Sequence, residues 1–416
     1  SANDRGDQLY ILTNADGAID FKVVTAPLAA PERANWRDLI PYREGVYVLD
    51  VELYAGHMVR LERANALPAI VIRDFSTGEE HAIAFDEAAY SLDTMGGYEF
   101  DTTNLRFSYS SMTTPSEVYD YDMAQRTRVL RKRQEIPSGH DPADYVTTRI
   151  MAKSHDGADV PVSLLHRKDF ARDGRAPLLL YGYGSYGHAM PASFNANRLS
   201  LVDRGFVYAI AHIRGGSDKG WGWYLDGKRE KKTNTFDDFA AAGRALIEAK
   251  YTGAKRIVGH GGSAGGMLMG AVANRAGELF AGIVAEVPFV DVLNTMLDDT
   301  LPLTPPEWPE WGNPIESEKD FRTILSYSPY DNVAAKDYPA ILAMGGLTDP
   351  RVTYWEPAKW IARLRATMRG GGPVLLRTNM GAGHGGASGR FNRLDEIAIV
   401  YAFALWAVGL ADKSDA

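Results

Sequence analysis

The stretch Gly261-Gly262-Ser263-Ala264-Gly265-Gly266 decides how the rest of this chain is interpreted. It follows the apolar run Ile257-Val258-Gly259 and precedes 267–273, a run whose composition is compatible with a helix. The pattern Gly-x-Ser-x-Gly between a strand and a helix is typical of a nucleophile elbow, a sharp turn that pushes the serine hydroxyl out of the sheet. Only small neighbours permit so tight a turn. The same turn directs the Ala264 amide N–H at the helix N-terminus, where an oxyanion can be held.

Taken alone, the hexapeptide also fits a glycine-rich loop without chemistry, because Gly and Ser are common in loops. The bulk properties narrow the alternatives. The 416 residues are 45% hydrophobic and 24% charged, which is typical of a soluble globular protein of one large or two ordinary domains. There is no apolar run of about 18 residues, so no membrane span is expected. The net charge of −8 argues against a nucleic-acid partner.

The chain contains no cysteine. This excludes disulfides, thiolate metal sites and a cysteine nucleophile, and it is consistent with a reducing compartment. We therefore expect a cytoplasmic protein that uses no metal and no cofactor. The chain starts at Ser1 rather than Met and runs at once into strand-like sequence, so the absence of a targeting signal carries little information.

The two halves of the chain follow different patterns. Residues 1–140 contain short apolar or alternating runs separated by turn residues, which predicts an all-β domain: a sandwich, a barrel or a propeller. At about 40–50 residues a blade, this half has room for about three blades of a β-propeller, whereas closed propellers contain about 4–8. The polar segment 131–142 is expected to link the domains, and its basic triplet to be a solvated strand end. The predicted strands are 9–12, 21–24, 46–51, 57–61, 69–72, 105–109 and 118–121.

From residue 141 onward, predicted strands alternate with predicted helices. The strands are near-continuous apolar runs, as a parallel sheet buried on both faces requires. This alternation predicts a doubly wound α/β domain over 141–416, with the elbow after a central strand. The predicted strands are 177–181, 206–211, 257–259, 282–287, 340–344 and 374–377, and the predicted helices are 236–250, 264–276, 353–368 and 393–410.

A serine hydroxyl becomes a good nucleophile only when a base accepts its proton and a third group orients that base. In the α/β-hydrolase fold the three groups follow in the order Ser, Asp or Glu, His. His384 is the only histidine C-terminal to Ser263, and it lies in the glycine-rich segment 380–386. We therefore expect His384 to be the base, with a surface loop histidine as the alternative.

The acid should follow a strand between Ser263 and His384. Asp349 comes shortly after the predicted strand 340–344, and we favour it because that strand end neighbours the one carrying the histidine loop. Asp291, after the strand that follows the elbow, is a competitor. Asp331 is a second competitor, although its surroundings are more typical of a turn or cap.

At this point the chain resembles the prolyl oligopeptidase family of serine peptidases and, within it, the oligopeptidases B. The resemblance covers essentially the whole length. It implies an α/β-hydrolase domain capped by a seven-bladed propeller, and cleavage of short peptides after Arg or Lys. The matching stretches are 181–187, 203–210, 213–216, 262–270, 287–292, 310–314, 327–333 and 354–360.

The resemblance gives Ser263, Asp349 and His384 the roles of nucleophile, orienting acid and base. It implies that the hydroxyl of Tyr183 donates to the oxyanion beside the Ala264 amide. The alternative for Tyr183 is a packed aromatic side chain.

Selectivity for a cationic side chain requires a carboxylate in the pocket, because a buried cation must be paired. The segment Thr304–Trp311, interpreted as a loop, supplies Glu307, which matches the family's glutamate for a basic P1 residue. Pro309 stands where relatives have a second acid, and Glu310 is expected to substitute in part. The resemblance implies that Arg351 holds a substrate backbone carbonyl, with a salt bridge to a loop carboxylate as the alternative.

Two departures from the family limit these expectations. Pro191 and Ser193 stand where relatives carry an acidic pair for a basic P2 residue, so only the P1 preference is expected. The resemblance also begins partway through the propeller. We expect the N-terminal segment and first blades of the family to be missing, so that this chain is a fragment or is completed by a segment supplied elsewhere.

Three functions remain open from the sequence. The first is a serine oligopeptidase that cleaves short peptides after Arg or Lys. The second is an esterase or acylaminoacyl-type hydrolase on the same scaffold, favoured if Glu307 points away from the pocket. The third is an inactive truncated chain whose three groups are present but not assembled.

Overall fold

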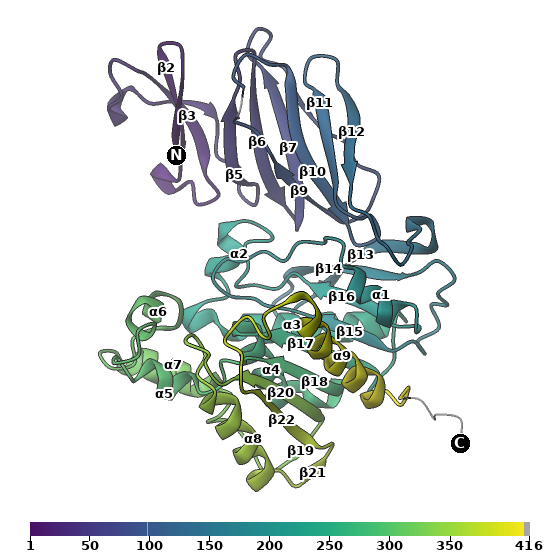
Figure 1. Ribbon diagram of the computed structural model, residues 1–416. Coiled ribbons are helices and arrows are strands. Elements are labelled where there is room, and N and C mark those ends of the chain that lie inside the picture. The colour runs from purple at the N-terminus through teal and green to yellow at the C-terminus, as the bar shows by residue number, and fades with distance from the viewer. Residues whose placement is uncertain (98, 412–416) are drawn as a thin grey trace. The chain divides into compact units, whose positions relative to one another are not determined.

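The computed structural model describes residues 1–97 and 99–411 (Figure 1). By their contacts the residues form two compact units. The sequence predicts one boundary after residue 140, whereas the contacts divide the chain after Arg149 and assign two short later segments to the first unit. The first unit contains 1–149, 191–196 and 217–223, and the second contains 150–190, 197–216 and the chain from 224 onward.

The first unit contains three four-stranded antiparallel sheets, as three propeller blades require (Figure 1). Each predicted strand of this half falls on an observed one. The first sheet contains β1 (Ala2–Arg5), β2 (Gln8–Thr13), β3 (Lys22–Pro27) and β4 (Arg37–Ile40). The second contains β5 (Tyr47–Leu53), β6 (His57–Ala64), β7 (Leu67–Asp74) and β8 (Glu80–Ala82). The third contains β9 (Tyr90–Thr94), β10 (Asn104–Ser111), β11 (Glu117–Asp122) and β12 (Thr127–Arg133).

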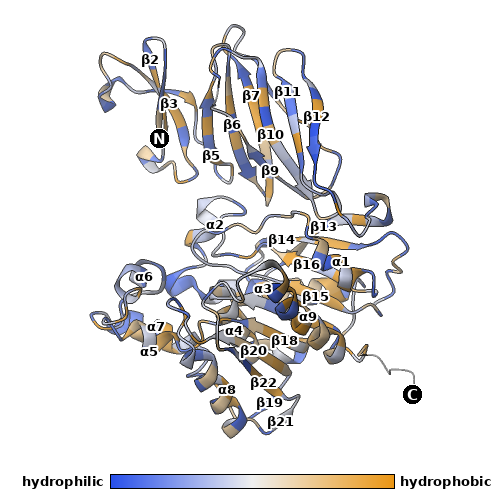
Figure 2. Cartoon of the chain, in the orientation of Figure 1, coloured by the Kyte–Doolittle hydropathy of each residue, from blue (hydrophilic) through white to orange (hydrophobic). Residues whose placement is uncertain are grey.

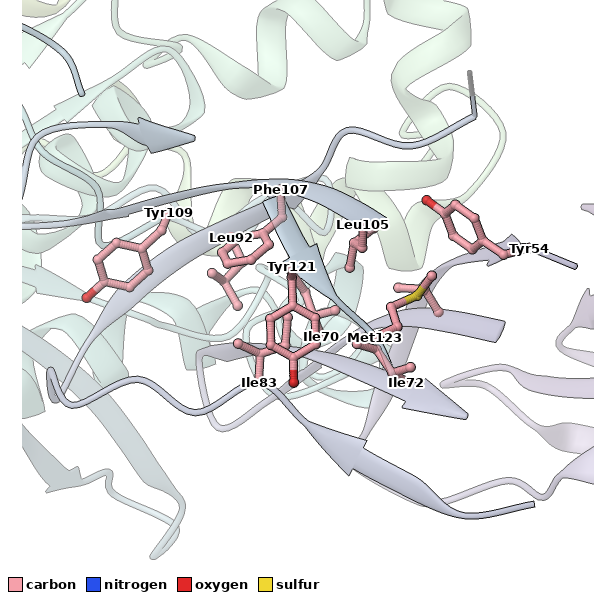
Figure 3. Packing of buried hydrophobic residues seen from close by; sticks show 11 residues of the cluster. Tyr54, Ile70, Ile72, Ile83, Leu92, Leu105, Phe107, Tyr109, Tyr121 and Met123 are labelled. Carbon is pink, nitrogen blue, oxygen red and sulfur yellow. The ribbon is translucent and has the colours of Figure 1, made fainter. Parts of the chain in front are cut away.

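Alternate residues of neighbouring sheets form the cores of this unit. Ile70 and Ile72 of β7 pack with Leu105 and Phe107 of β10, and Tyr121 of β11 joins the same cluster (Figure 3). A second cluster joins the first two sheets and contains Tyr10, Val23, Ile40, Val48, Val51 and Met58. Because side chains alternate between the faces of a strand, residues two apart enter the same core.

The basic triplet at 131–133 is the end of β12, as predicted. Every residue of β12 is exposed, and the strand is coloured hydrophilic in Figure 2. Arg131 and Arg133 donate to Asp120 and Glu117 of β11, at 2.7 and 2.6 Å. The charges therefore line an edge strand, where they discourage pairing with another sheet.

An eight-stranded sheet forms the centre of the second unit. Its order is β13-β14-β16-β15-β17-β18-β20-β22, parallel from β16 to β22, with β14 antiparallel to β16. The central strands are largely hydrophobic, as Figure 2 shows for β15 and β16, although β17 contains His260 and β18 ends at Glu286. The sequence analysis did not predict the first two of these strands. The bounds are β13 (Tyr145–Lys153), β14 (Asp159–Arg167), β15 (Leu178–Tyr181), β16 (Val207–Ala211), β17 (Ile257–Gly262), β18 (Phe280–Glu286), β20 (Ala340–Gly346) and β22 (Val374–Asn379), with a separate pair β19 (Asp337–Tyr338) and β21 (Gly370–Gly371).

Helices pack against this sheet, so the predicted doubly wound α/β architecture is confirmed. The helix α4 packs on β17 and β18, α8 on β20 and β22, and α9 on β18 and β20. The four predicted helices correspond to α3, α4, α8 and α9. The helices are α1 (Ala196–Val202), α2 (Trp221–Leu225), α3 (Thr233–Glu248), α4 (Ala264–Ala276), α5 (Val292–Met296), α6 (Thr304–Trp311), α7 (Glu318–Tyr327), α8 (Trp355–Thr367) and α9 (Arg390–Ala407). In the described part of the chain, none of them is both long and apolar enough to cross a bilayer.

The interpretation of Thr304–Trp311 as a loop is wrong, because this segment is helix α6. Pro305 and Pro306 occupy the first turn, where an N–H would have no intrahelical partner. Gly312 ends the helix with a φ of 113°, a conformation that favours glycine. Glu307 is therefore carried by a helix.

Candidate active site

Ser263 occupies the turn between β17 and α4, and its backbone is strained. Its φ of 57° and ψ of −119° lie where non-glycine residues are rarely found. The turn is held by the neighbouring strand, because the Ser263 N–H donates to the carbonyl of Glu286 at 2.9 Å. The Ser263 carbonyl accepts from the N–H groups of Gly266 at 2.9 Å and Phe289 at 3.1 Å. The surrounding backbone thus fixes the predicted elbow.

Two glycines are required for the chain to pack around this turn. A Cβ on Gly261 would lie 2.3 Å from the carbonyl oxygen of Gly265. A Cβ on Gly265 would lie 2.8 Å from the carbonyl oxygen of Gly182 and 3.3 Å from the Tyr183 ring. The small residues of the elbow therefore also allow the loop after β15 to approach the start of α4.

Ser263, His384 and Asp349 form a continuous chain of hydrogen bonds. The Nε2 atom of His384 lies 3.0 Å from Ser263 Oγ, and its Nδ1 lies 2.7 Å from Asp349 Oδ2. The other oxygen of Asp349 accepts from the backbone N–H groups of Arg351 at 2.8 Å and Val352 at 3.0 Å. The carboxylate side chain is fully buried. The structure brings together the three residues that the sequence analysis grouped.

The competing acids have other partners. Asp291 is buried at the start of α5 and forms an ion pair with Lys359 of α8. Asp331 accepts a hydrogen bond from the Ser328 hydroxyl at 2.7 Å, as a turn residue does. Among the described carboxylates, only Asp349 is hydrogen-bonded to His384.

The loop carrying His384 is anchored from α9. Glu396 accepts a hydrogen bond from the N–H of Ala387 at 3.0 Å. Arg393 donates to the carbonyl oxygen of Gly385 at 2.9 Å. The glycine-rich segment, which the sequence suggests is flexible, is thus tied to a helix on both sides of Gly386.

Two donors lie beside the Ser263 hydroxyl. The amide N–H of Ala264 opens α4, and this residue is buried. The Tyr183 side chain lines the same cavity as Ser263, and burial raises the pKa of Tyr183, with the negative charges of Glu307 and Glu310 adding to the effect. Tyr183 therefore keeps its proton at neutral pH and remains a donor.

A cavity of about 600 Å³ opens beside Ser263 in the second unit. Tyr183, Ala264, Glu307 and Arg351 line it, together with apolar side chains that include Phe289, Met296, Leu301 and Leu303. The Arg351 side chain is exposed. The cavity thus contains Glu307 and Arg351, two of the three charged residues predicted from the sequence to bind substrate.

Glu307 is fixed by two donors that meet on one oxygen. Its Oε2 accepts from the Tyr186 hydroxyl at 2.5 Å and from Trp311 Nε1 at 2.8 Å. Within residues 1–97 and 99–411, no donor reaches its Oε1. One carboxylate oxygen is therefore held and the other is available to a ligand.

Glu310 was expected from the sequence to help bind the substrate, but it is not among the residues that line the cavity. It is buried, and its two oxygens accept from the Tyr186 N–H at 2.9 Å and the Tyr224 hydroxyl at 2.6 Å. The carboxylate thus positions Tyr186, which in turn holds Glu307. Pro191 and Ser193 belong to the 191–196 segment of the first unit.

Two charged residues escaped the sequence analysis. Lys232 is fully buried and donates to the carbonyl oxygens of Gly184 at 2.6 Å and Gly227 at 3.1 Å, and to Ser185 Oγ at 2.8 Å. Glu356 is buried and lines the cavity. Lys232 ends the charged run 228–232, and Glu356 is the second residue of a helix, a position that is commonly acidic and exposed, so no pattern in the sequence indicates their burial. The described residues contain no group of three or more His, Asp and Glu side chains placed to hold a metal ion.

Comparisons with known proteins agree with this architecture. Residues 1–134 match the N-terminal β-propeller domain of prolyl oligopeptidases, and residues 192–411 match the prolyl oligopeptidase family. Dipeptidyl aminopeptidase BI of Pseudoxanthomonas mexicana is 49% identical over 99% of the chain and 57% of its own length. Protease 2 of Moraxella lacunata is 42% identical over 97% of the chain and 58% of its own length.

Solved structures of oligopeptidases B are also similar to this chain. Oligopeptidase B from Leishmania major superposes with a TM-score of 0.91 at 37% identity, covering all of this chain and 59% of that one. Oligopeptidase B from Trypanosoma brucei, with covalently bound antipain in a closed form, also gives 0.91, at 40% identity over 98% of this chain and 59% of that one. The chain thus spans less than two thirds of the length of these relatives. With both of its units matched, the chain belongs to the prolyl oligopeptidase family of serine peptidases.

Proposed function

We propose that this chain carries the catalytic machinery of a serine oligopeptidase that cleaves short peptides after Arg or Lys. One observation carries the proposal. A histidine bonded to both a buried carboxylate and a serine on a strained elbow lies at a cavity that also contains Glu307.

The contacts support a two-step reaction. His384 Nε2 accepts the Ser263 proton while Oγ bonds to the substrate carbonyl carbon, whose oxygen becomes negative. Tyr183 and the Ala264 N–H donate to that oxygen. Collapse breaks the C–N bond, and the imidazolium gives its proton to the leaving amine. Water then attacks the acyl-enzyme with His384 again acting as base. Asp349 fixes the ring and stabilises its charged form.

The P1 preference rests on Glu307. Its Oε2 is anchored by Tyr186 and Trp311, so Oε1 is positioned for a guanidinium or ammonium group. The apolar wall from Phe289 to Leu303 suits the methylene stem of Arg or Lys. Arg351, at the same cavity, is proposed to bind a backbone carbonyl of the substrate.

Three peptide amides that differ only at P1 test the preference: Arg, its neutral isostere citrulline, and Phe. We expect kcat/KM to be at least about thirtyfold higher for Arg than for citrulline, since an unpaired buried charge costs about 2–5 kcal/mol. E307Q should sharply reduce this difference. E318Q, which removes an exposed carboxylate of α7, is the control for net charge. Equal kcat/KM values for all three amides with the wild-type chain would contradict the proposed preference for Arg or Lys at P1.

A second candidate is a hydrolase that recognises the substrate's amino terminus. The name of the 49% identical relative, dipeptidyl aminopeptidase BI, is the observation that favours it. Dipeptide amides with free and acetylated amino termini separate the two candidates. A large loss of kcat/KM on acetylation supports the second, and equal rates support an oligopeptidase.

An inactive chain is another alternative, because the chain spans less than two thirds of the length of its relatives. Fluorophosphonate labelling of the 416-residue chain tests it directly. Stoichiometric labelling of Ser263 that S263A abolishes would show an activated nucleophile. Absence of labelling would mean that the 416-residue chain does not by itself hold an activated nucleophile.

A further inference from the structure

A second carboxylate, Glu356, lies on the wall of the Ser263 cavity. It is the second residue of α8 and is only 1% exposed. Its Oε1 accepts from the Thr295 hydroxyl at 2.7 Å, and its Oε2 accepts from the Asp291 N–H at 3.0 Å. Asp291 is the N-cap residue of α5 and Thr295 lies within that helix, so Glu356 joins α8 to α5.

No cation neutralises this carboxylate. Lys359, one turn further along α8, forms an ion pair with Asp291 instead. Asp291 itself faces Glu356 and adds negative charge, and the remaining charged groups on the cavity wall are Glu307 and Arg351. In the described chain, no Lys, Arg or His side chain forms an ion pair with Glu356.

A structural role alone does not require an acid at this position. Holding α5 takes only hydrogen-bond acceptors, which a glutamine supplies in part because the Thr295 hydroxyl can turn to accept. A buried unpaired carboxylate is costly unless it stays protonated. Burial, followed by the nearby Asp291, raises the pKa of Glu356 to about 7, against the opposing effect of hydrogen bonds from Asp291, Thr295 and Val290. The cavity wall thus carries an acid that is partly neutral near pH 7.

We propose that Glu356 is a second specificity-determining carboxylate of the Ser263 cavity, which ionises and releases its proton to water when a cationic P1 side chain enters. This inference rests on the proposed preference for Arg and Lys. A cation in the cavity supplies the missing partner, so the carboxyl loses its proton and the charge pair forms. A neutral P1 side chain meets a neutral acid and gains nothing.

The proposal makes cation binding depend on pH. With a pKa of about 7, about half of the Glu356 groups carry a proton at pH 7. Binding of a cation therefore releases about half a proton at pH 7, and the apparent affinity rises about tenfold from pH 6 to pH 8. Neither effect is expected for a neutral ligand.

Benzamidine, an amidinium probe, allows both quantities to be measured with the 416-residue chain. Titration calorimetry at pH 7 in two buffers of different ionisation enthalpy gives the number of protons released. We expect about 0.5 for the wild type, none for E356Q, and the wild-type value for the surface control E318Q. H384A should keep the release, which separates a role of Glu356 from one of the imidazole beside Ser263.

The outcomes distinguish the two proposals. If benzamidine fails to bind, both the P1 preference and this inference are overturned. If it binds without releasing protons in the wild type, or if E356Q still releases them, only the role of Glu356 is overturned. Loss of the release in H384A would assign the proton to His384. Even if E356Q does not fold, absence of release in the wild type, or its loss in H384A, still overturns the role of Glu356.

Discussion

The Nδ1 atom of His384 lies 2.7 Å from a carboxylate oxygen of Asp349 whose partner oxygen is already held by two backbone N–H groups. Asp349 can therefore only accept at this position, and it selects the tautomer of His384 whose Nε2 accepts from Ser263. In D349N an amide N–H can face the ring and select the opposite tautomer. We expect kcat to fall about 10⁴-fold with KM little changed. A decrease in kcat of less than about tenfold would mean that another group orients His384.

Tyr183 is expected to act on the transition state rather than on substrate binding. Y183F keeps the ring but removes the donor beside Ser263. Loss of one oxyanion donor lowers kcat about 10²–10³-fold. Y186F is the matched comparison, because Tyr186 holds Glu307 and its loss should raise KM for Arg substrates instead. Steady-state kinetics of both variants test this division, and equal effects on kcat would contradict it.

Gly265 is expected to couple packing to activity. In G265A the added methyl would lie 2.8 Å from the Gly182 carbonyl oxygen and press on Tyr183, so we expect a loss of about 1–3 kcal/mol of stability and a lower kcat. G270A, on the same helix α4, meets Pro329 at 2.7 Å and should cost stability without moving Tyr183. Unfolding curves and kcat values for both variants give the comparison. Full activity in G265A would show that the loop after β15 adjusts freely.

Lys232 is expected to position the loop that carries Tyr183. K232M leaves the Gly184 carbonyl and the Ser185 hydroxyl without their buried donor. The loop should shift, and kcat should fall by more than about tenfold, the effect of losing 1.4 kcal/mol. If Lys232 acts through Tyr183, K232M combined with Y183F should lose little beyond Y183F alone. Additive losses in this double-mutant cycle would refute the link.

Glu356 is expected to make stability depend on pH. Its pKa is raised from 4.5 in the unfolded chain to about 7, so the folded state binds the proton more tightly. The resulting stabilisation is fully present below pH 4.5 and is lost as the pH rises through about 7. The unfolding free energy of the wild type relative to E356Q should therefore fall by about 2–3 kcal/mol from pH 5 to pH 8. Urea unfolding of both proteins at both pH values measures this change. An equal difference in unfolding free energy at pH 5 and pH 8 would contradict the prediction.

The sequence predicted the arrangement around Ser263 well because chemistry and topology restrict the choices. Only one histidine follows Ser263, and a parallel sheet brings the carboxyl ends of neighbouring strands to one edge. Asp349 and His384 follow β20 and β22, which are adjacent, as the choice of Asp349 assumed. The alternation of strands and helices predicted the α/β architecture, and the closely spaced short runs predicted strands in each of the three four-stranded sheets of the first unit.

The residues that were missed depend on tertiary packing. Lys232 ends a run of charged residues, and Glu356 stands near a helix start, so both resemble surface positions. Their burial is set by partners 48 and 65 residues away, Gly184 and Asp291, which no local pattern reveals. The segment of α6 contains three prolines, a composition more typical of a loop, but Pro305 and Pro306 lie in the first turn of the helix, where proline is tolerated.

The order of the strands also bears on when reactivity arises. Ser263 and His384 are 121 residues apart, and their contact requires β17, β18, β20 and β22 to have paired. Such non-local pairings form late, because long stretches of chain must first close. During refolding, fluorophosphonate labelling should therefore recover after the far-ultraviolet circular dichroism signal, and simultaneous recovery would contradict this. A nascent chain thus carries an inert serine on the ribosome until its last strand has been made and docked.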